Sequence, residues 1–345
     1  MAKNIVLCSD GTGNTPGKGR GTNVWKLYLA VDRHDHEENP ARPRQIAFYD
    51  DGVGTEGIRF FRILGGAFGL GLSRNIRQLY AHLVLNYEPG DKVFLFGFSR
   101  GAFTVRSLAG MICQCGLLKR DDYLGKSIKE RNKLLKRILR AYRSEDKDAG
   151  KNIREALGLR SIEIEFIGVW DTVDAVGMPF DDLKAVDRIW RKVFGVRLWG
   201  FHDQVLSSKV KRGCQALAID DERRTFHPNV WEPREGIEQV WFAGVHSNVG
   251  GGYPKEGLSN VALYWMFLQA KEAGLRFLPY CIHAAHDQAN VHAKLYDSRV
   301  GLAAYYRYKP RNIEALCGNG NVKVHVTAAD RNQVRCGLRR NSYCQ

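Results

Sequence analysis

The pentapeptide G-F-S-R-G at positions 97–101 has the residue types of a serine nucleophile turn and is the only G-x-S-x-G sequence in the 345-residue chain. An apolar segment, Lys92–Phe98, precedes the serine, and a segment with helical spacing, Phe103–Leu118, follows it. A sharp turn between a strand and a helix strains the serine and places it beside the free N–H groups of the helix N-terminus, which stabilise an oxyanion. We therefore predict that Ser99 is a nucleophile and that the N–H of Arg100 donates to the oxyanion. The alternative is a structural Gly-Ser-Gly turn.

A serine nucleophile needs a base and an acid that orients the base, and in hydrolases with this turn the chain order is serine, acid, histidine. The apolar segment Ile162–Trp170 is followed at once by Asp171, and the segment Gln239–Val245 is followed by His246 and a glycine-rich loop. We predict that His246 takes the serine proton and that Asp171 orients its imidazole. Other candidates are the acids Asp174, Asp203 and Asp220 and the bases His202 and His325.

A second polar turn follows the first apolar segment, where Ser9 is followed by Asp10, Gly11, Thr12 and Gly13. A turn rich in glycine and hydroxyl groups after a strand suits a second oxyanion donor, a wall of the site or a phosphate cradle. We predict that residues 10–13 form an oxyanion donor or a wall of the active site. Two alternatives remain, an aspartyl nucleophile of a phosphatase and a tight turn in which Asp10 caps its own backbone.

These candidate residues require a scaffold that brings the ends of several strands together, and strand-like and helix-like segments alternate along the chain. Further helices are expected at Asn23–Val31, 72–87 and Asn260–Ala273, and further strands at Asn4–Cys8 and Gln45–Tyr49. The alternation predicts an α/β protein with a mostly parallel sheet and helices on both faces. Together with the strand–G-x-S-x-G–helix turn, it favours the α/β-hydrolase fold. We expect a single domain over residues 1–345, with helical cap insertions at about 119–160 and 178–236.

The chain is strongly basic, with 52 Lys and Arg residues against 37 Asp and Glu residues and a net charge of +15. Such a charge favours anionic partners, including an anionic membrane surface. Residues 119–160 carry much of it, together with apolar residues at helical spacing. This segment is either a solvated outer helix face or an amphipathic helix that faces lipid or a partner. No nucleic-acid-binding signature is present, and we expect no nucleic acid partner.

Other patterns exclude several classes of site. The eight cysteines form no C-x-x-C pair, and the histidines at 34–36 and 283–292 lack the pattern of a zinc site. We therefore expect no metal and no cofactor. No apolar run has the length of a signal-peptide core or of a membrane-spanning helix, so we expect a protein that is cytoplasmic as synthesised.

Six motifs occur in a fixed order along the chain: NIVLCSDGTGN at the start, YDDGVGT at 49–55, GFSRGAFTVRSLAGMI at 97–112, GVWDTVDAVG at 168–177, ALAIDDERRTFHPNVW at 216–231 and VWFAGVHSNVGGGYP at 240–254. In these motifs, from about residue 3 to about residue 254 and more faintly to Arg331 (VKVHVTAADR), the chain resembles the bacterial type VI secretion phospholipase effectors of the first lipase class.

The resemblance implies an α/β-hydrolase fold, phospholipase activity of the A1 or A2 type, and Ser99, Asp171 and His246 as the catalytic residues. It also implies delivery outside the cell by a type VI system, with the secretion apparatus or an immunity protein as partners. One residue departs from the family, whose glycine-rich loop usually reads H-S-D-V-G-G-G, because this chain has Asn248 in place of the aspartate.

The leading hypothesis is thus a serine ester hydrolase that acts on membrane phospholipids. Two alternatives are a soluble carboxylesterase of small substrates and a non-enzymatic binding protein on the same fold.

Overall fold

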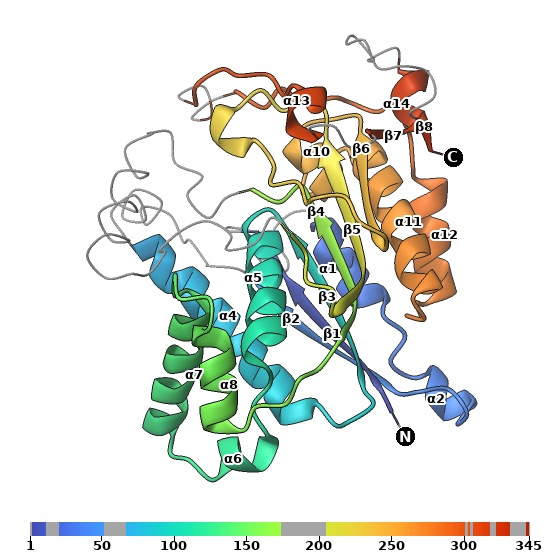
Figure 1. Cartoon of the computed structure of the whole chain (residues 1–345). Helices are drawn as coiled ribbons and strands as arrows, with labels where there is room; N and C mark the ends of the chain where they lie inside the picture. The colour runs from blue at the N-terminus through green and yellow to red at the C-terminus, as the bar shows by residue number, and fades with distance from the viewer. Residues whose placement is uncertain are drawn as a thin grey trace.

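A parallel sheet lies between two layers of helices in the computed structural model, which describes residues 2–11, 21–51, 67–173, 205–300, 303, 306–317, 322–331 and 343–344 (Figure 1). The strands are β1 Asn4–Ser9, β2 Gln45–Asp50, β3 Lys92–Phe98, β4 Ile164–Trp170, β5 Val210–Ala218, β6 Ile237–Phe242, β7 Lys323–His325 and β8 Tyr343–Cys344. Their order in the sheet is β2-β1-β3-β4-β5-β6-β7-β8, and every neighbouring pair is parallel. The predicted α/β-hydrolase fold with a mostly parallel sheet is confirmed.

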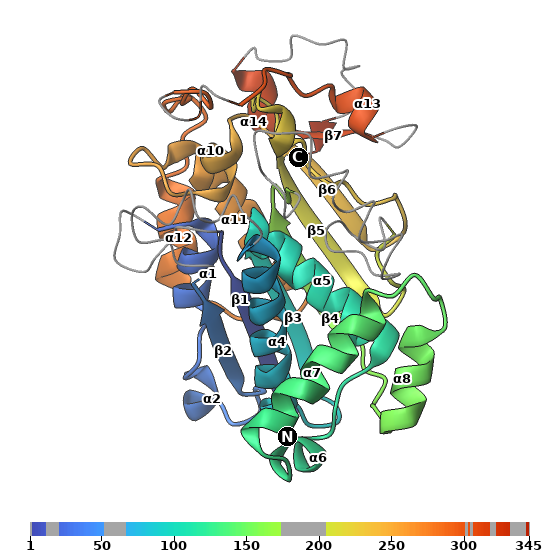
Figure 2. The same cartoon turned by 90° about the vertical axis from the view of Figure 1, so that its left-hand side faces the viewer.

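The helices of the described ranges cover both faces of the sheet. They are α1 Asn23–Ala30, α2 Asp35–Glu38, α4 Ala67–Asn86, α5 Arg100–Cys115, α6 Arg120–Leu124, α7 Ile128–Tyr142, α8 Ala149–Leu157, the 3₁₀ turn Arg224–Phe226, α10 His246–Gly250, α11 Gly257–Glu272, α12 Pro279–Asp287, α13 Ile313–Cys317 and α14 Val326–Asp330. Figure 2 shows α4, α5 and α7 in front of one face of the sheet.

Side chains alternate between the two faces because successive residues of a strand point in opposite directions. In β3, Val93 and Leu95 pack with α4, α5, α7 and α8, whereas Phe94 and Phe96 pack with α1, α11 and α12. Both faces are therefore apolar, and the strand reads as a continuous hydrophobic run, as parallel strands buried on both sides do.

Every helix in the described part of the chain is too short or too polar to span a lipid bilayer.

The expected insertion at about 178–236 is wrong in part, because it contains β5. This strand lies in the middle of the sheet, between β4 and β6. Its sequence, VKRGCQALA, has two charged residues after the first valine and a glutamine in its second half, and it lacks the β-branched run that marks a buried strand. Residues 174–204, which include the tryptophan-rich part of the expected insertion, lie outside the described residues.

The basic segment 119–160 forms α6, α7 and α8, which pack on α4 and α5. Helix α7 buries Leu134, Leu135, Ile138, Leu139 and Tyr142 in the same core as α5. Both views place α6 at the end of the molecule opposite α10 (Figures 1 and 2). The apolar side of α7 thus packs inside the protein, whereas most of its basic residues are exposed: Lys129, Lys133, Lys136, Arg137 and Arg140.

Candidate active site

The turn from β3 to α5 holds Ser99 in an unusual backbone conformation, with φ +57° and ψ −119°. The glycines two residues before and two residues after Ser99 have no room for a side chain. A Cβ on Gly97 would lie 2.6 Å from the carbonyl oxygen of Gly101, and a Cβ on Gly101 would lie 2.0 Å from that of Ser9. Helix α5 starts directly at Arg100, so the first N–H groups of the helix lie beside Ser99. This is the strained turn that the G-x-S-x-G pattern predicts.

The ends of β4 and β6 bring the predicted acid and base together. Asp171, which follows β4 and has φ +40°, accepts a hydrogen bond of 2.6 Å at Oδ2 from His246 Nδ1. The backbone of Ser99 lies next to that of Asp171, because the Ser99 N–H donates to the carbonyl oxygen of Trp170, the residue before Asp171, at 3.1 Å.

Two aromatic rings hold the imidazole of His246. The ring of Phe98, next to Ser99 in the chain, lies 4.6 Å from the imidazole centroid, and the ring of Phe226 packs edge-on at 5.1 Å. Nε2 of His246 is buried and has no hydrogen-bond partner within the described part of the chain. This nitrogen is the one that a catalytic base uses toward its nucleophile.

The carboxylate of Asp171 is fully buried and receives four hydrogen bonds. Besides His246 Nδ1, the donors are the N–H of Ala218, at 3.0 Å, and both Nη atoms of Arg311, at 2.6 and 2.8 Å. Burial alone would raise the pKa of Asp171, but the charge of Arg311 and the hydrogen bonds from His246 and Arg311 hold it well below its usual value. Asp171 is therefore ionised at neutral pH.

Burial has the opposite outcome for His246, whose pKa is lowered because desolvation outweighs the hydrogen bond and charge of Asp171. The imidazole is thus neutral at physiological pH, as a general base must be. Burial also lowers the pKa of Arg100 to about 10.

Three residues of the site were missed in the sequence analysis. Asp221 is fully buried, accepts from the backbone N–H of His246 at 3.1 Å and binds Arg223. Asp221 and Phe226 both lie in the motif at 216–231, so the sequence marked that segment although not their contacts. Arg311 lies in no motif, and no pattern of the sequence indicates it.

The turn after β1 lies beside the nucleophile turn, because the Cβ position of Gly101 would also meet the backbone of Asp10 at 2.7 Å. Asp10 is buried and accepts hydrogen bonds from the N–H of Gly11, the hydroxyl of Thr22 and the hydroxyl of Tyr49. Both of its oxygens are engaged, which does not suit the aspartyl nucleophile of a phosphatase. The Gly11 N–H is occupied as well, and Thr12 and Gly13 lie outside the described residues.

The other candidate acids and bases have different partners or are not described. Asp220 accepts from the N–H of Gly244 at 2.6 Å, at the end of β6. His325 stacks on Phe242, with 4.7 Å between ring centroids, and its Nδ1 contacts the hydroxyl of Thr327. The remaining candidates lie outside the described residues: Asp174, His202 and Asp203.

Asn248 stands where the family usually has aspartate. Both the nitrogen and the oxygen of its side-chain amide bind backbone groups. Its Nδ2 donates to the carbonyl oxygen of Lys294 at 3.2 Å, and its Oδ1 accepts from the N–H of Tyr296 at 3.2 Å. A carboxylate has no donor for Lys294, so the amide joins the turn after β6 to the segment 294–296 in a way that aspartate would not.

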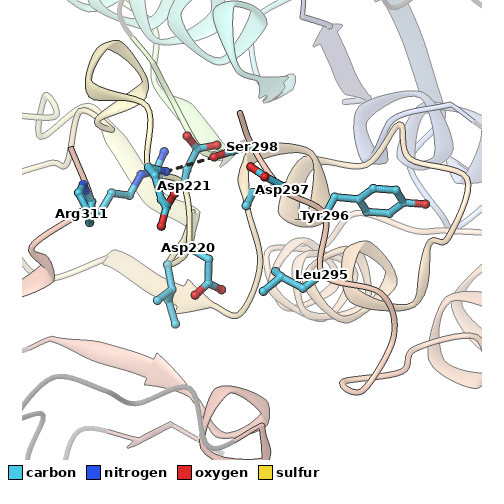
Figure 3. A pocket seen from close by; sticks show the side chains of 11 residues that line it. Asp220, Asp221, Leu295, Tyr296, Asp297, Ser298 and Arg311 are labelled. Carbon is cyan, nitrogen blue, oxygen red and sulfur yellow. Dashed lines mark hydrogen bonds between the residues drawn. The ribbon is translucent and has the colours of Figure 1, made fainter. Parts of the chain in front are cut away.

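A cavity of about 430 Å³ adjoins the site, and both Asp221 and Arg311 line it (Figure 3). Its walls are the turn after β5, the segment 295–298 and residues 310–311, and four of its lining side chains are acidic: Asp220, Asp221, Glu222 and Asp297. Within the described ranges, no three His, Cys, Asp or Glu side chains are arranged to hold a metal ion.

Residues 3–269 match the model of the family described as "T6SS, Phospholipase effector Tle1-like, catalytic domain". The chain belongs to this family. A relative of the Tle1-like domain in Saccharomyces cerevisiae, the uncharacterized protein YEL023C, is 31% identical over 203 residues, which cover 52% of this chain and 28% of the yeast protein.

Solved structures with some similarity to this Tle1-like chain have low TM-scores. An uncharacterized protein from Pseudomonas aeruginosa has a TM-score of 0.44 at 19% identity, over 84% of this chain and 49% of that one. The Tle1 effector bound to the VgrG spike of the type 6 secretion system has a TM-score of 0.36 at 20% identity, over 73% and 51% of the two chains. The chain thus spans about half of these structures and less than a third of the yeast protein.

Proposed function

We propose that this chain is a serine ester hydrolase that cleaves acyl esters of membrane phospholipids, with Ser99, Asp171 and His246 as its catalytic residues. The observation that carries the proposal is the buried pair Asp171–His246, with its unpartnered Nε2, beside a serine at positive φ. Membership of a family described by its phospholipase effectors supports the substrate class.

In the proposed reaction, Ser99 Oγ attacks the acyl carbonyl carbon while His246 Nε2 takes its proton. Asp171 keeps the second proton of the imidazole on Nδ1 and stabilises the cation that forms. The oxyanion of the tetrahedral intermediate receives the N–H of Arg100 and the positive end of the α5 dipole. His246 then returns its proton to the leaving alcohol, and a water molecule activated by the same imidazole hydrolyses the acyl-enzyme.

The finer parts of the function rest on the family alone. Cleavage of the A1 or A2 type, delivery outside the cell by a type VI system and binding to the secretion apparatus all fit a Tle1-like domain. The Tle1 effector of the similar structure is bound to the VgrG spike, which makes a spike protein the first partner to test for this chain.

One experiment tests the activity and the substrate class together. Purified protein and its Ser99→Ala variant are incubated with mixed phospholipid vesicles and with a short soluble ester, and a fluorophosphonate probe reports the reactive serine. We expect labelling and fatty acid release by the wild type only. Ester cleavage without phospholipid cleavage would indicate a carboxylesterase, and the absence of labelling and of both activities would indicate a binding protein.

A further inference from the structure

We propose that Arg311 is a positioning residue of this active site, which holds the Asp171 carboxylate in the orientation that His246 needs and neutralises its charge. The inference rests on the proposed hydrolase function. It adds a residue that lies 42 positions beyond the end of the matched family region at residue 269 (311 − 269).

The guanidinium of Arg311 meets the carboxylate of Asp171 edge to edge. Nη1 donates to Oδ1 at 2.6 Å and Nη2 donates to Oδ2 at 2.8 Å, and neither side chain has exposed surface. The same two nitrogens donate to the carbonyl oxygens of Ala218 and Phe226. A planar guanidinium bound at four points prevents the carboxylate from rotating about its last bond.

This arrangement determines where the imidazole finds its acceptor. Oδ2 of Asp171 accepts from both Arg311 and His246, whereas Oδ1 is held by Arg311 and the N–H of Ala218. If the carboxylate turned, His246 Nδ1 would lose its acceptor, and with it the tautomer that leaves Nε2 free to accept a proton.

The charge of Arg311 has a second consequence. A carboxylate beside a catalytic histidine normally favours the imidazolium, because opposite charges attract. Here the guanidinium compensates the charge of Asp171, so the imidazolium of His246 gains less from it. The neutral base should therefore persist to lower pH than in a site without the arginine.

Arg311 lies in a segment that also forms part of the wall of the site. The N–H of Lys309 donates to the carbonyl oxygen of Glu222 at 2.8 Å, and the N–H of Arg224 donates to that of Arg307 at 2.9 Å. The ring of Tyr306 packs edge-on against Phe226, which in turn contacts His246. Residues 306–311 are thus tied to the 222–226 segment along their length.

The test compares Arg311→Met with Arg276→Met, which breaks another bidentate arginine–carboxylate pair, that with Asp35, away from the active site. The pH dependence of kcat/KM is measured on a short soluble ester, and Tm is measured for each variant. We expect Arg311→Met to lower kcat/KM at least about 100-fold and to raise the midpoint of the acid limb by about one pH unit or more, because a cation has been removed. Arg276→Met should lower Tm and leave the kinetic profile unchanged.

A second variant, Arg311→Lys, keeps the charge but not the two-pronged contact. It should retain the acid limb of the wild type, with kcat reduced about tenfold or more and KM little changed. An unmoved acid limb in folded Arg311→Met would overturn the proposed charge effect, and wild-type kcat in Arg311→Lys would overturn the positioning role, also if Arg311→Met does not fold. An active wild type with either result contradicts only this inference, whereas a wild type that cleaves no ester overturns the proposed function together with it.

Discussion

Two arginine–aspartate pairs of this chain have similar geometry and lie at opposite ends of the parallel strands, which are called the amino edge and the carboxyl edge of the sheet. At the amino edge, Arg276 binds Asp35 through Nε and Nη2, and its backbone N–H donates to Gln45, the first residue of β2. At the carboxyl edge, Arg311 binds Asp171 through its two Nη atoms. In both pairs, burial would raise the pKa of the carboxyl group, but the arginine together with the other donors to the carboxylate lowers it.

The two pairs differ in what else the carboxylate touches. Asp35 is additionally bound by Arg42, and Arg276 also donates to the carbonyl oxygen of Pro43, so these contacts join α2, the start of β2 and the segment after α11. The carboxylate of Asp171 additionally accepts from an imidazole. An ion pair therefore does not indicate a function by itself. Its place does, because the strand ends and helix N-termini that build a site meet at the carboxyl edge of a parallel sheet.

The largest effect is expected from Ser99→Ala at the carboxyl edge. Turnover of a short soluble ester should fall at least about 1,000-fold, because the nucleophile is removed and the residues of a triad act as a unit. Tm should stay near that of the wild type, since the substitution removes one oxygen atom. A folded Ser99→Ala protein with near-normal turnover would refute the mechanism.

The choice of base is tested by His246→Ala and His325→Ala. Loss of His246 should lower turnover by a similar factor, because its imidazole packs on Phe98 beside Ser99 and is the proposed general base. His325 stacks on Phe242 and should be needed only for stability. Kinetics on the same ester distinguish the two, and an inactive His325→Ala with an active His246→Ala would reverse the assignment.

The comparison of the two pairs is tested directly by Asp171→Asn and Asp35→Asn. Both remove the negative charge of a buried pair, and both should lower Tm, because an arginine is left without its counter-charge. Only Asp171→Asn should lower kcat, about 1,000-fold or more, through the wrong tautomer of His246. Equal losses of kcat in the two variants would contradict the distinction between the edges.

A smaller effect is expected in the pH profile of the wild type. The pKa of His246 is lowered by burial, so the base loses its function only when the pH falls below the ordinary histidine value of about 6.5. The acid limb of kcat/KM should therefore have its midpoint below that value. A midpoint near 7.5 would mean that Asp171 stabilises the imidazolium in spite of Arg311.

The smallest effect on turnover is expected for the basic helix α7. Its exposed cations should attract an anionic leaflet by about 1 kcal/mol each, and this attraction is screened over about 8 Å at physiological ionic strength. Replacing Lys133, Lys136, Arg137 and Arg140 with Gln should reduce co-sedimentation with anionic vesicles at low salt and leave turnover of a soluble ester unchanged.

A matched variant carries four Gln substitutions at exposed basic residues that lie after α10 or in or next to the segments 295–298 and 306–311: Lys255, Lys294, Arg307 and Lys309. If this variant loses vesicle binding and the α7 variant does not, the carboxyl edge faces the membrane and the prediction for α7 is wrong. Equal binding by the wild type and both variants at low salt would leave the basic charge without a role at the membrane.

Local patterns of the sequence determined much of the fold and part of the site. The strand at Lys92–Phe98 was predicted with the bounds that it has, because an apolar run buried on both faces needs no partner to be identified. The turn at Ser99 follows from glycines whose absent side chains make room for it. The start of α5 was predicted three residues too late, since Gly101 lowers helix propensity and its reason lies in the contact with Ser9.

The order of the strands decided which residues meet at the candidate site. It places β4 beside β3 and β6 two strands farther along, so that Asp171 and His246 meet although 75 residues separate them. The sheet also includes β5, a buried strand that the sequence did not indicate because two charged residues stand near its start. Arg311 is the clearest case, because a single buried ion pair has no periodicity, and its partner stands 140 residues away. The sequence alone predicts a serine, an acid and a base in the expected order, whereas only the tertiary structure shows which cation compensates the acid.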